Sequence, residues 1–104
     1  MHRIAFTMQL HPGAEAEYRR RHAAIWPELA ALLQDSGISA YSIFLDAASG
    51  RLFAYLQVAD PEQLAELPRY PVMQRWWDYM KDIMDTHANA SPVTTSLDEV
   101  FYMP

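Results

Sequence analysis

The stretch that decides the fold is residues 38–58, ISAYSIFLDAASGRLFAYLQV, because it contains two strand-like runs in succession. Residues 38–46 and 51–58 are rich in β-branched, aromatic and aliphatic side chains. A short polar loop that ends in Gly50 separates them, as in a turn between neighbouring strands. The pattern therefore predicts a hairpin of two antiparallel strands.

The residues before this hairpin predict one strand and two helices. Apolar side chains alternate with others over residues 3–10, which is typical of a strand covered on at least one face. A Pro-Gly pair at residues 12–13 interrupts the alternation, and a helix is expected over about residues 14–24. Because proline suits the first turn of a helix but clashes with a turn before it, Pro27 predicts a second helix, from residue 26 or 27 to 34.

The residues after the hairpin predict two further helices and a last strand. Asp60 and the proline that follows it form a helix start, and a short helix is expected to end near Leu67. Residues 72–84 carry apolar side chains at helical spacing, so a longer helix is expected there. A polar loop over residues 85–96 and a strand over residues 97–103 complete the chain.

The predicted order is strand, helix, strand, strand, helix, strand, which in 104 residues fits one α+β domain. This is the ferredoxin-like (βαββαβ) arrangement, an antiparallel sheet with helices on one face, and the domain is expected to span residues 1–104. The other face would be open, and aromatic residues such as Phe6 or Tyr41 are expected on it. An uncovered apolar face of that size normally binds a partner, so a symmetric homodimer, sheet against sheet, is predicted.

The composition excludes several classes of partner. Against 13 Asp and Glu there are 8 Lys and Arg, so the formal net charge is −5, no basic stripe is present, and nucleic acid is not an expected partner. No apolar stretch approaches membrane-spanning length and no leader segment precedes the first strand, so no membrane partner is expected. The chain has no cysteine, which excludes disulfides and thiolate chemistry and fits a reducing compartment. A cytoplasmic protein is therefore expected.

The residue pair most suited to chemistry is Tyr18 and His22, which stand at i and i+4 if residues 14–24 are helical. Their phenol and imidazole then project side by side, with Glu15 a further turn back, and histidine exchanges protons readily near neutral pH. The alternative is structural: a half-exposed histidine beside a core tyrosine with a solvated hydroxyl. No HExxH-like pair accompanies His22, so a metal site is not expected.

Aromatic side chains in the predicted last helix suit a sugar-binding surface. Adjacent helical residues diverge by about 100°, so Trp76 and Trp77 cannot face one pocket equally. Trp77 shares a stripe with three methionines and is expected to be the better core residue, which leaves Trp76 freer; the alternative is that both are core. Tyr41, in the middle of a strand, is a further candidate wall, and its alternative is an ordinary sheet aromatic.

Three strings resemble the L-rhamnose mutarotase family: YRRRHAAIWPEL at residues 18–29, QRWWDYM at residues 74–80 and SPVTTSLDEVFYMP at residues 91–104. The resemblance covers essentially the whole chain. It implies a ferredoxin-like homodimer of the dimeric αβ-barrel type that interconverts the α and β anomers of L-rhamnose, in rhamnose and carbohydrate metabolism. Such an isomerase, of the aldose 1-epimerase type, uses no metal or organic cofactor.

The same resemblance implies roles for five residues. His22 would be the proton donor, and Tyr18 a catalytic, proton-relaying hydroxyl that also binds the substrate. Tyr41, Trp76 and Trp77 would form the walls of the sugar pocket.

Other functions and one chemical detail stay open at this point. Cofactor-free or haem-handling oxygenases of the dimeric αβ-barrel type share the expected architecture, and fold alone does not separate them from mutarotases. A non-catalytic module would bind a sugar without accelerating anomer exchange. In the mutarotase hypothesis the anomeric proton could pass to Tyr18, to a bound water or to Glu15, because a phenol with a reference pKa of about 10 is a weak base.

Overall fold

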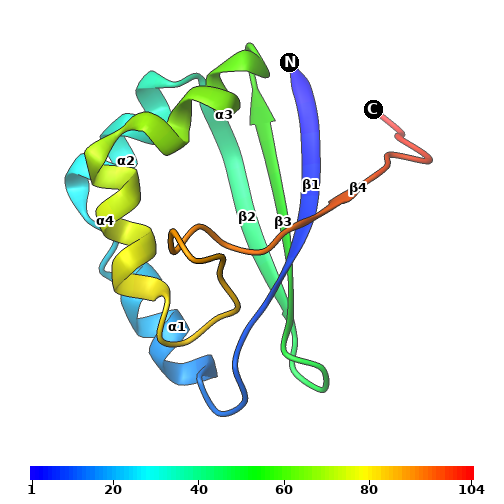
Figure 1. The fold of residues 1–104 in the computed structure, drawn as a ribbon. Helices are drawn as coiled ribbons and strands as arrows, with labels where there is room; N and C mark the ends of the chain where they lie inside the picture. The colour runs from blue at the N-terminus through cyan, green and yellow to red at the C-terminus, as the bar shows by residue number, and fades with distance from the viewer.

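The chain folds into four strands and four α-helices, as a computed structural model of residues 1–104 shows (Figure 1). In chain order the elements are β1 (His2–Gln9), α1 (Glu15–Ala23), α2 (Pro27–Asp35), β2 (Ile38–Asp46), β3 (Arg51–Val58), α3 (Glu62–Glu66), a 3-10 turn η1 (Leu67–Arg69), α4 (Pro71–Met80) and β4 (Thr95–Leu97). This succession confirms the predicted order of strands and helices. None of the helices is long and apolar enough to cross a membrane.

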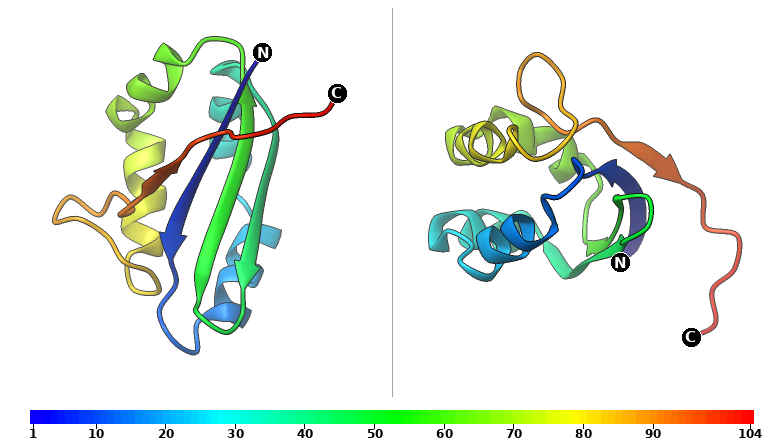
Figure 2. Two further views of the ribbon diagram at one scale, coloured as in Figure 1. Left: turned by 90° about the vertical axis from the view of Figure 1, so that its right-hand side faces the viewer. Right: turned by 90° about the horizontal axis from the view of Figure 1, so that it is seen from below.

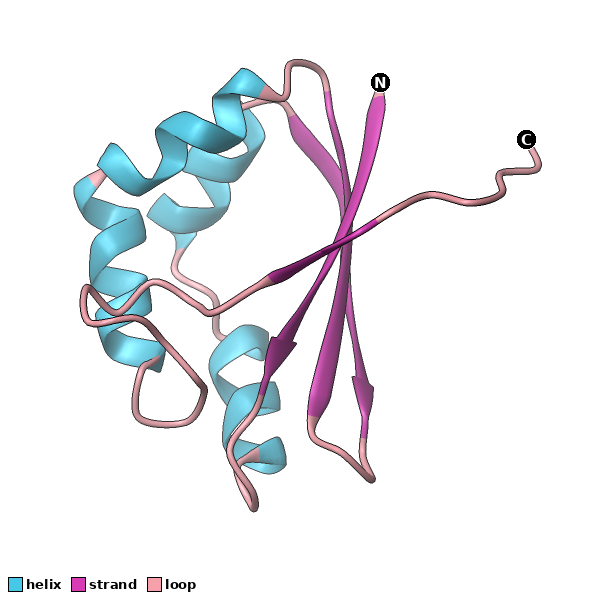
Figure 3. Cartoon of the chain, turned by 45° about the vertical axis from the view of Figure 1, so that its right-hand side comes forward, coloured by secondary structure: helices cyan, strands magenta, loops and turns pink.

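The strands form one antiparallel sheet in the order β2-β3-β1-β4. The helices form a layer on one side of this sheet, and the other side is open (Figures 2 and 3). The hairpin of β2 and β3 has the boundaries that the sequence predicts. The α+β, ferredoxin-like prediction is therefore confirmed.

The core lies between the sheet and the helix layer. Met8 of β1 pairs with Leu52 of β3, and both are buried against Leu29 of α2 and Met80 of α4 in one apolar cluster. Fully burying a side chain of this size contributes roughly 1.5–3 kcal/mol. The alternation of β1 and β3 thus decides which side of the sheet receives the helices.

The open face of the sheet carries aromatic residues other than those predicted. Phe44 of β2 pairs with Phe53 of β3, and they are 66% and 39% exposed. Leu97 of β4 is also exposed. Phe6 was expected on this face, and that prediction is wrong, because Phe6 shares the alternation phase of Met8 and packs against the core.

Tyr41 also faces the helices, so its predicted place on the open face is wrong as well. A bulge between Ser39 and Ser42 adds one residue to β2 relative to β3, and Ala40 within it has a φ of 51°. Strict alternation from the buried Ile38 would turn Tyr41 outward. The extra residue reverses the phase, so that Tyr41 lines the space between the sheet and the helices.

The last helix ends earlier than predicted. α4 ends at Met80, whereas the sequence predicts a helix over residues 72–84. Near this end, the guanidinium of Arg21 donates a hydrogen bond of 2.7 Å to the carbonyl of Tyr79. Met84 instead forms an isolated bridge with Leu10 beyond β1. Contacts with distant parts of the chain therefore end a pattern that could continue as a helix.

The last strand is also shorter than predicted. β4 covers only Thr95–Leu97, whereas a strand was expected over residues 97–103. Beyond Leu97 the chain leaves the sheet (Figure 1), and Val100 is 94% exposed. Glu99 there binds Arg3 of β1 at 2.8 Å through its side chain. Residues of high β-propensity form a strand only where a neighbouring strand is available, and within one chain this segment has none.

Candidate active site

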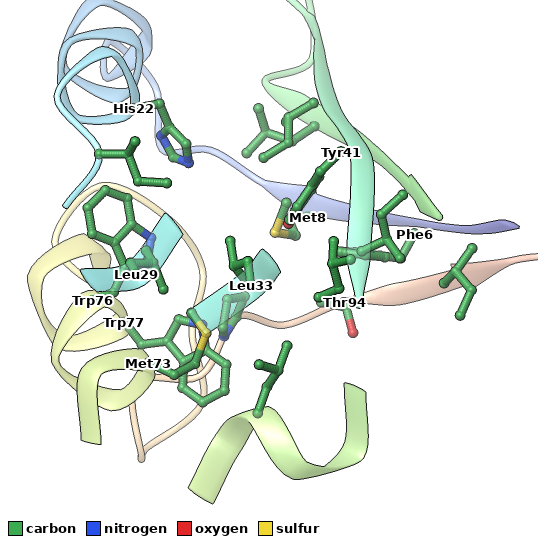
Figure 4. A pocket seen from close by; sticks show the side chains of 18 of the residues that line it. Phe6, Met8, His22, Leu29, Leu33, Tyr41, Met73, Trp76, Trp77 and Thr94 are labelled. Carbon is green, nitrogen blue, oxygen red and sulfur yellow. The ribbon is translucent and has the colours of Figure 1, made fainter. Parts of the chain in front are cut away.

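A cavity of about 1010 Å³ lies between the sheet and the helix layer. Most of the side chains that line it are hydrophobic, and they come from the sheet as well as from α1, α2 and α4 (Figure 4). The residues singled out from the sequence all line this cavity: Tyr18, His22, Tyr41, Trp76 and Trp77. Elements far apart in the sequence therefore bring all five predicted site residues to one place.

Tyr18 and His22 lie side by side because both belong to α1. Their ring centroids are 4.2 Å apart and the rings are stacked at 27°, as the i, i+4 spacing predicts. Tyr18 is buried and His22 is half-buried. His22 occupies the last turn of α1, which ends at Ala23.

The backbone fixes the tautomer of His22. Its Nδ1 lies 3.1 Å from the carbonyl oxygen of Tyr18. A carbonyl only accepts hydrogen bonds, so Nδ1 carries the proton and, in the neutral imidazole, Nε2 has the free lone pair. Burial lowers the pKa of His22, and the hydrogen bond to Tyr18 opposes this shift only in part. His22 is therefore mainly neutral near pH 7, with Nε2 ready to accept a proton.

The two tyrosines of the cavity keep their protons. Burial, helped by the nearby Tyr41, raises the pKa of Tyr18 above its ordinary value. Burial also raises the pKa of Tyr41 to about 12. Although 40% of Tyr41 as a whole residue is exposed, its side chain points from β2 into the cavity (Figure 4). Both phenols can donate a hydrogen bond to a ligand oxygen, and neither is an effective base at neutral pH.

The tryptophans of α4 form the wall next to His22, but not in the predicted manner. Trp76 is 6% exposed and lies edge-on to His22, with ring centroids 5.4 Å apart. Trp77 is only half-buried. The prediction that Trp77 is the core residue and Trp76 the freer one is therefore wrong. The buried stripe of α4 runs through Met73, Trp76 and Met80, because the helix ends before Met84 could extend the other stripe.

One residue that supports this wall from outside the cavity was missed by the sequence analysis. Trp26 lies edge-on to Trp76 at 5.1 Å and stacks on Tyr79 at 5.5 Å, so it supports the outer side of the wall. The signal was available: Trp26 lies four residues after His22 and directly before Pro27. Trp26 lies between the two predicted helices, and spacing rules apply only within one helix, so the spacing from His22 did not predict its position.

The charged side chains that line the cavity neutralise each other. Arg19 Nη2 lies 3.1 Å from Glu15 Oε1, one turn apart on α1. Glu15, a candidate acceptor of the anomeric proton, is therefore held in an ion pair. No group of three or more His, Cys, Asp or Glu side chains is placed to hold a metal ion.

The sequence model of the L-rhamnose mutarotase family matches residues 3–103 of the chain. An L-rhamnose mutarotase of Sinorhizobium medicae is 52% identical over 103 residues, which are 99% of each chain. The crystal structure of an L-rhamnose mutarotase from Formosa agariphila matches with a TM-score of 0.94 and 42% identity, over 100% of both chains.

A more distant structure shares the fold alone. The crystal structure of a candidate antibiotic biosynthesis monooxygenase from Deinococcus radiodurans matches with a TM-score of 0.62 and 15% identity. The match covers 99% of this chain and 97% of the Deinococcus chain. At such low identity the likeness indicates a common architecture and not a common activity.

Replacing His22 by Gln is expected to reduce the loss of stability between about pH 7.5 and about pH 5.5. Burial lowers the pKa of His22 in the folded state, so the unfolded chain binds more protons near pH 6 and the wild type loses stability as the pH falls. Glutamine does not titrate. Urea unfolding at the two pH values measures the effect, and an equal loss in both proteins would contradict it. Glu17, whose pKa Arg20 and Arg21 lower to about 2, titrates well below this range.

Proposed function

Since the chain belongs to the L-rhamnose mutarotase family, we propose that it interconverts the α and β anomers of L-rhamnose with His22 as its main proton-transfer group. Members of this family are carbohydrate isomerases. The observation that carries the proposal is the Tyr18–His22 pair, which offers one free imidazole nitrogen and one protonated phenol to the same apolar cavity.

Anomer exchange needs one proton removed and one delivered. When the anomeric hydroxyl loses its proton, its oxygen forms the carbonyl with C1, and the bond from C1 to the ring oxygen breaks. The ring oxygen then takes a proton. Rotation about the C1–C2 bond presents the other face of the aldehyde, and the same steps in reverse close the ring. No carbon–hydrogen bond breaks in this cycle, so the reaction requires no cofactor.

His22 can serve both halves of this cycle. Its neutral form takes the anomeric proton at Nε2, and the resulting imidazolium is the proton donor to the ring oxygen. The lowered pKa of His22 favours both the neutral resting form and the release of the proton. The phenol of Tyr18 binds the sugar oxygen on which charge develops and relays a proton there. Glu15 is held in its ion pair with Arg19 and is assigned no step.

The cavity walls suit a 6-deoxy sugar. The apolar C–H faces of a pyranose pack well on indole and phenol rings, and Trp76, Trp77 and Tyr41 supply these rings from two opposite layers. The mainly hydrophobic lining also accommodates the C6 methyl group without leaving a buried polar atom unpaired. These three residues are accordingly proposed to bind the substrate, together with Tyr18.

The open face of the sheet supports a homodimer. Phe44 and Phe53 are exposed neighbours there, and the tail after Leu97, which carries exposed apolar residues, runs out on the side of the sheet away from the helices (Figure 1). A second copy of this chain, placed sheet against sheet, would cover them by a self-complementary contact. We also propose a cytoplasmic enzyme of rhamnose metabolism, since a chain without cysteine is compatible with a reducing compartment.

The His22→Gln variant is expected to lose about 10²- to 10⁴-fold in the rate of anomer exchange, the usual contribution of a general acid or base. Tyr18→Phe should lose less, because it removes only the relaying hydroxyl. Saturation transfer between the two anomeric proton signals of L-rhamnose measures exchange as protein is added. Near-normal anomer exchange in a folded His22→Gln protein would contradict the assignment of His22 as the main proton-transfer group. Sugar binding without exchange in the wild type would indicate a binding module instead.

The two tryptophans are expected to respond differently to replacement by alanine. Trp76→Ala should cost about 3–5 kcal/mol of unfolding free energy, because Trp76 is a buried core residue. Trp77→Ala should weaken L-rhamnose binding about 3- to 10-fold and cost far less stability, as expected for loss of an aromatic stacking surface. Thermal unfolding and a titration with sugar measure the two effects. Equal losses of stability would contradict the distinction.

Phe44→Glu is expected to convert the proposed dimer into a monomer, because it places a charge within the proposed apolar contact. Tyr70→Glu, at another exposed aromatic position, is the matched control and should remain a dimer. Sedimentation equilibrium measures the mass of each protein. A monomeric wild type would overturn the proposed assembly and leave the assignment of the active site untouched.

A further inference from the structure

Arg21 is a buried arginine directly before the proposed proton-transfer residue in the sequence. Only 8% of it is exposed. Its Nε donates to Glu17 Oε2 at 2.7 Å, and its Nη1 and Nη2 bind the two carboxylate oxygens of Asp82 at 2.8 and 3.1 Å. Nη1 also donates to the carbonyl of Tyr79 at 2.7 Å. The guanidinium is thus bonded on several sides, and this set of contacts is called the Arg21 clamp below.

The Arg21 clamp joins α1 to the end of α4. The last carbonyls of a helix have no partner within the helix, and a cation at this end is favourable. Arg21 supplies both a hydrogen bond to Tyr79 and a charge, and its guanidinium carbon lies 4.5 Å from the centre of the Tyr79 ring. No α-carbon of α1 lies within 8 Å of one of α4. Side chains therefore set the distance between these helices, and Arg21 makes a hydrogen bond and a ring contact across the gap.

The same helix end carries the wall that faces His22. Tyr79 lies 5.7 Å from Trp76, about one turn earlier on α4, and Trp76 meets His22 edge-on at 5.4 Å. A shift or rotation of α4 relative to α1 would change the contact between Trp76 and His22. Arg21 itself does not line the cavity. Any influence of Arg21 on the chemistry must therefore act through the placement of these neighbours.

We propose that Arg21 is a positioning residue, whose clamp on Glu17, Tyr79 and Asp82 holds the imidazole of His22 against Trp76 in the geometry required for proton transfer. This rests on the proposed function, since it assigns the proton transfer to His22. A displacement of about 1 Å in a reacting group can cost about 10²-fold in rate, so loss of the clamp should be felt in the chemical step. Sugar binding is shared with Tyr41 and Trp77, which the clamp does not contact, so it should fall less than the rate.

The variants Arg21→Met and Asp82→Asn test the proposal. Methionine keeps an apolar stem and removes the charged head, whereas asparagine keeps the shape of Asp82 and removes one of the two charge-assisted bonds. For anomer exchange we expect kcat to fall about 10- to 100-fold in Arg21→Met and less in Asp82→Asn, with KM for L-rhamnose changed less than about threefold. Arg75→Met is the matched control. Arg75 directly precedes Trp76, and its exposed pair with Glu28, at 3.7 Å, also links two helices.

A second readout follows the placement of His22 without using activity. The imidazole protons of His22 lie beside the rings of Tyr18 and Trp76, so their NMR shifts report this packing, and comparison with His22→Gln identifies the signals. These shifts should move in Arg21→Met and Asp82→Asn and stay in place in Arg75→Met.

Three outcomes would overturn the positioning role. The first is a folded Arg21→Met protein that loses stability but keeps both its kcat and its His22 shifts, which would make Arg21 a structural anchor only. The second is a large rise in KM with unchanged kcat, which would place Arg21 in sugar binding. If Arg21→Met does not fold, the Asp82→Asn variant decides the question. The third outcome is then an Asp82→Asn protein whose kcat and His22 shifts are both unchanged. A wild type without anomer exchange would refute the proposed function, and the His22 shifts alone would then decide whether Arg21 places the imidazole.

Discussion

The space between the sheet and the helices must stay open, and much of the molecule follows from this constraint. Protein interiors normally close to native packing density, because an unfilled apolar volume costs dispersion contacts. Here a cavity of about 1010 Å³ persists between two layers. Polar contacts within the helix layer, such as those of Arg21 with Asp82 and the Tyr79 carbonyl, join α1 to the end of α4 and so help to fix the helix wall of this cavity.

The sequence predicts the elements whose cause is local. The alternation of β1, the loop before Gly50 and the proline at residue 27 each determine their own neighbourhood, and Tyr18 and His22 meet because one helical turn separates them. What the sequence does not predict depends on partners far along the chain. A bulge reverses the phase of Tyr41, and α4 ends where Arg21 meets it, which exchanges the expected roles of its two tryptophans.

The comparison with a monooxygenase-like fold indicates where specificity is built. The Deinococcus structure shares the topology at 15% identity, so the backbone arrangement does not require any particular chemistry. The distinguishing features are the side chains that enter the cavity. In this chain most of them are aromatic or apolar, and an imidazole and two phenols are among the polar groups. That set suits a neutral ligand rich in hydroxyl groups, since it offers no excess charge to bind.

The proposed proton transfer between His22 and the sugar oxygens has a stereochemical consequence. Ring opening produces an aldehyde, and the hydrogen on the neighbouring carbon, C2, is then acidified. A base placed beside C2 would remove it and convert the sugar to its C2 epimer or to a ketose. Burial lowers the pKa of His22, and a weakly basic imidazole exchanges protons with oxygen atoms much faster than it removes a proton from carbon. In the proposed mechanism, anomer exchange at His22 therefore stays faster than loss of configuration at C2 while the ring is open.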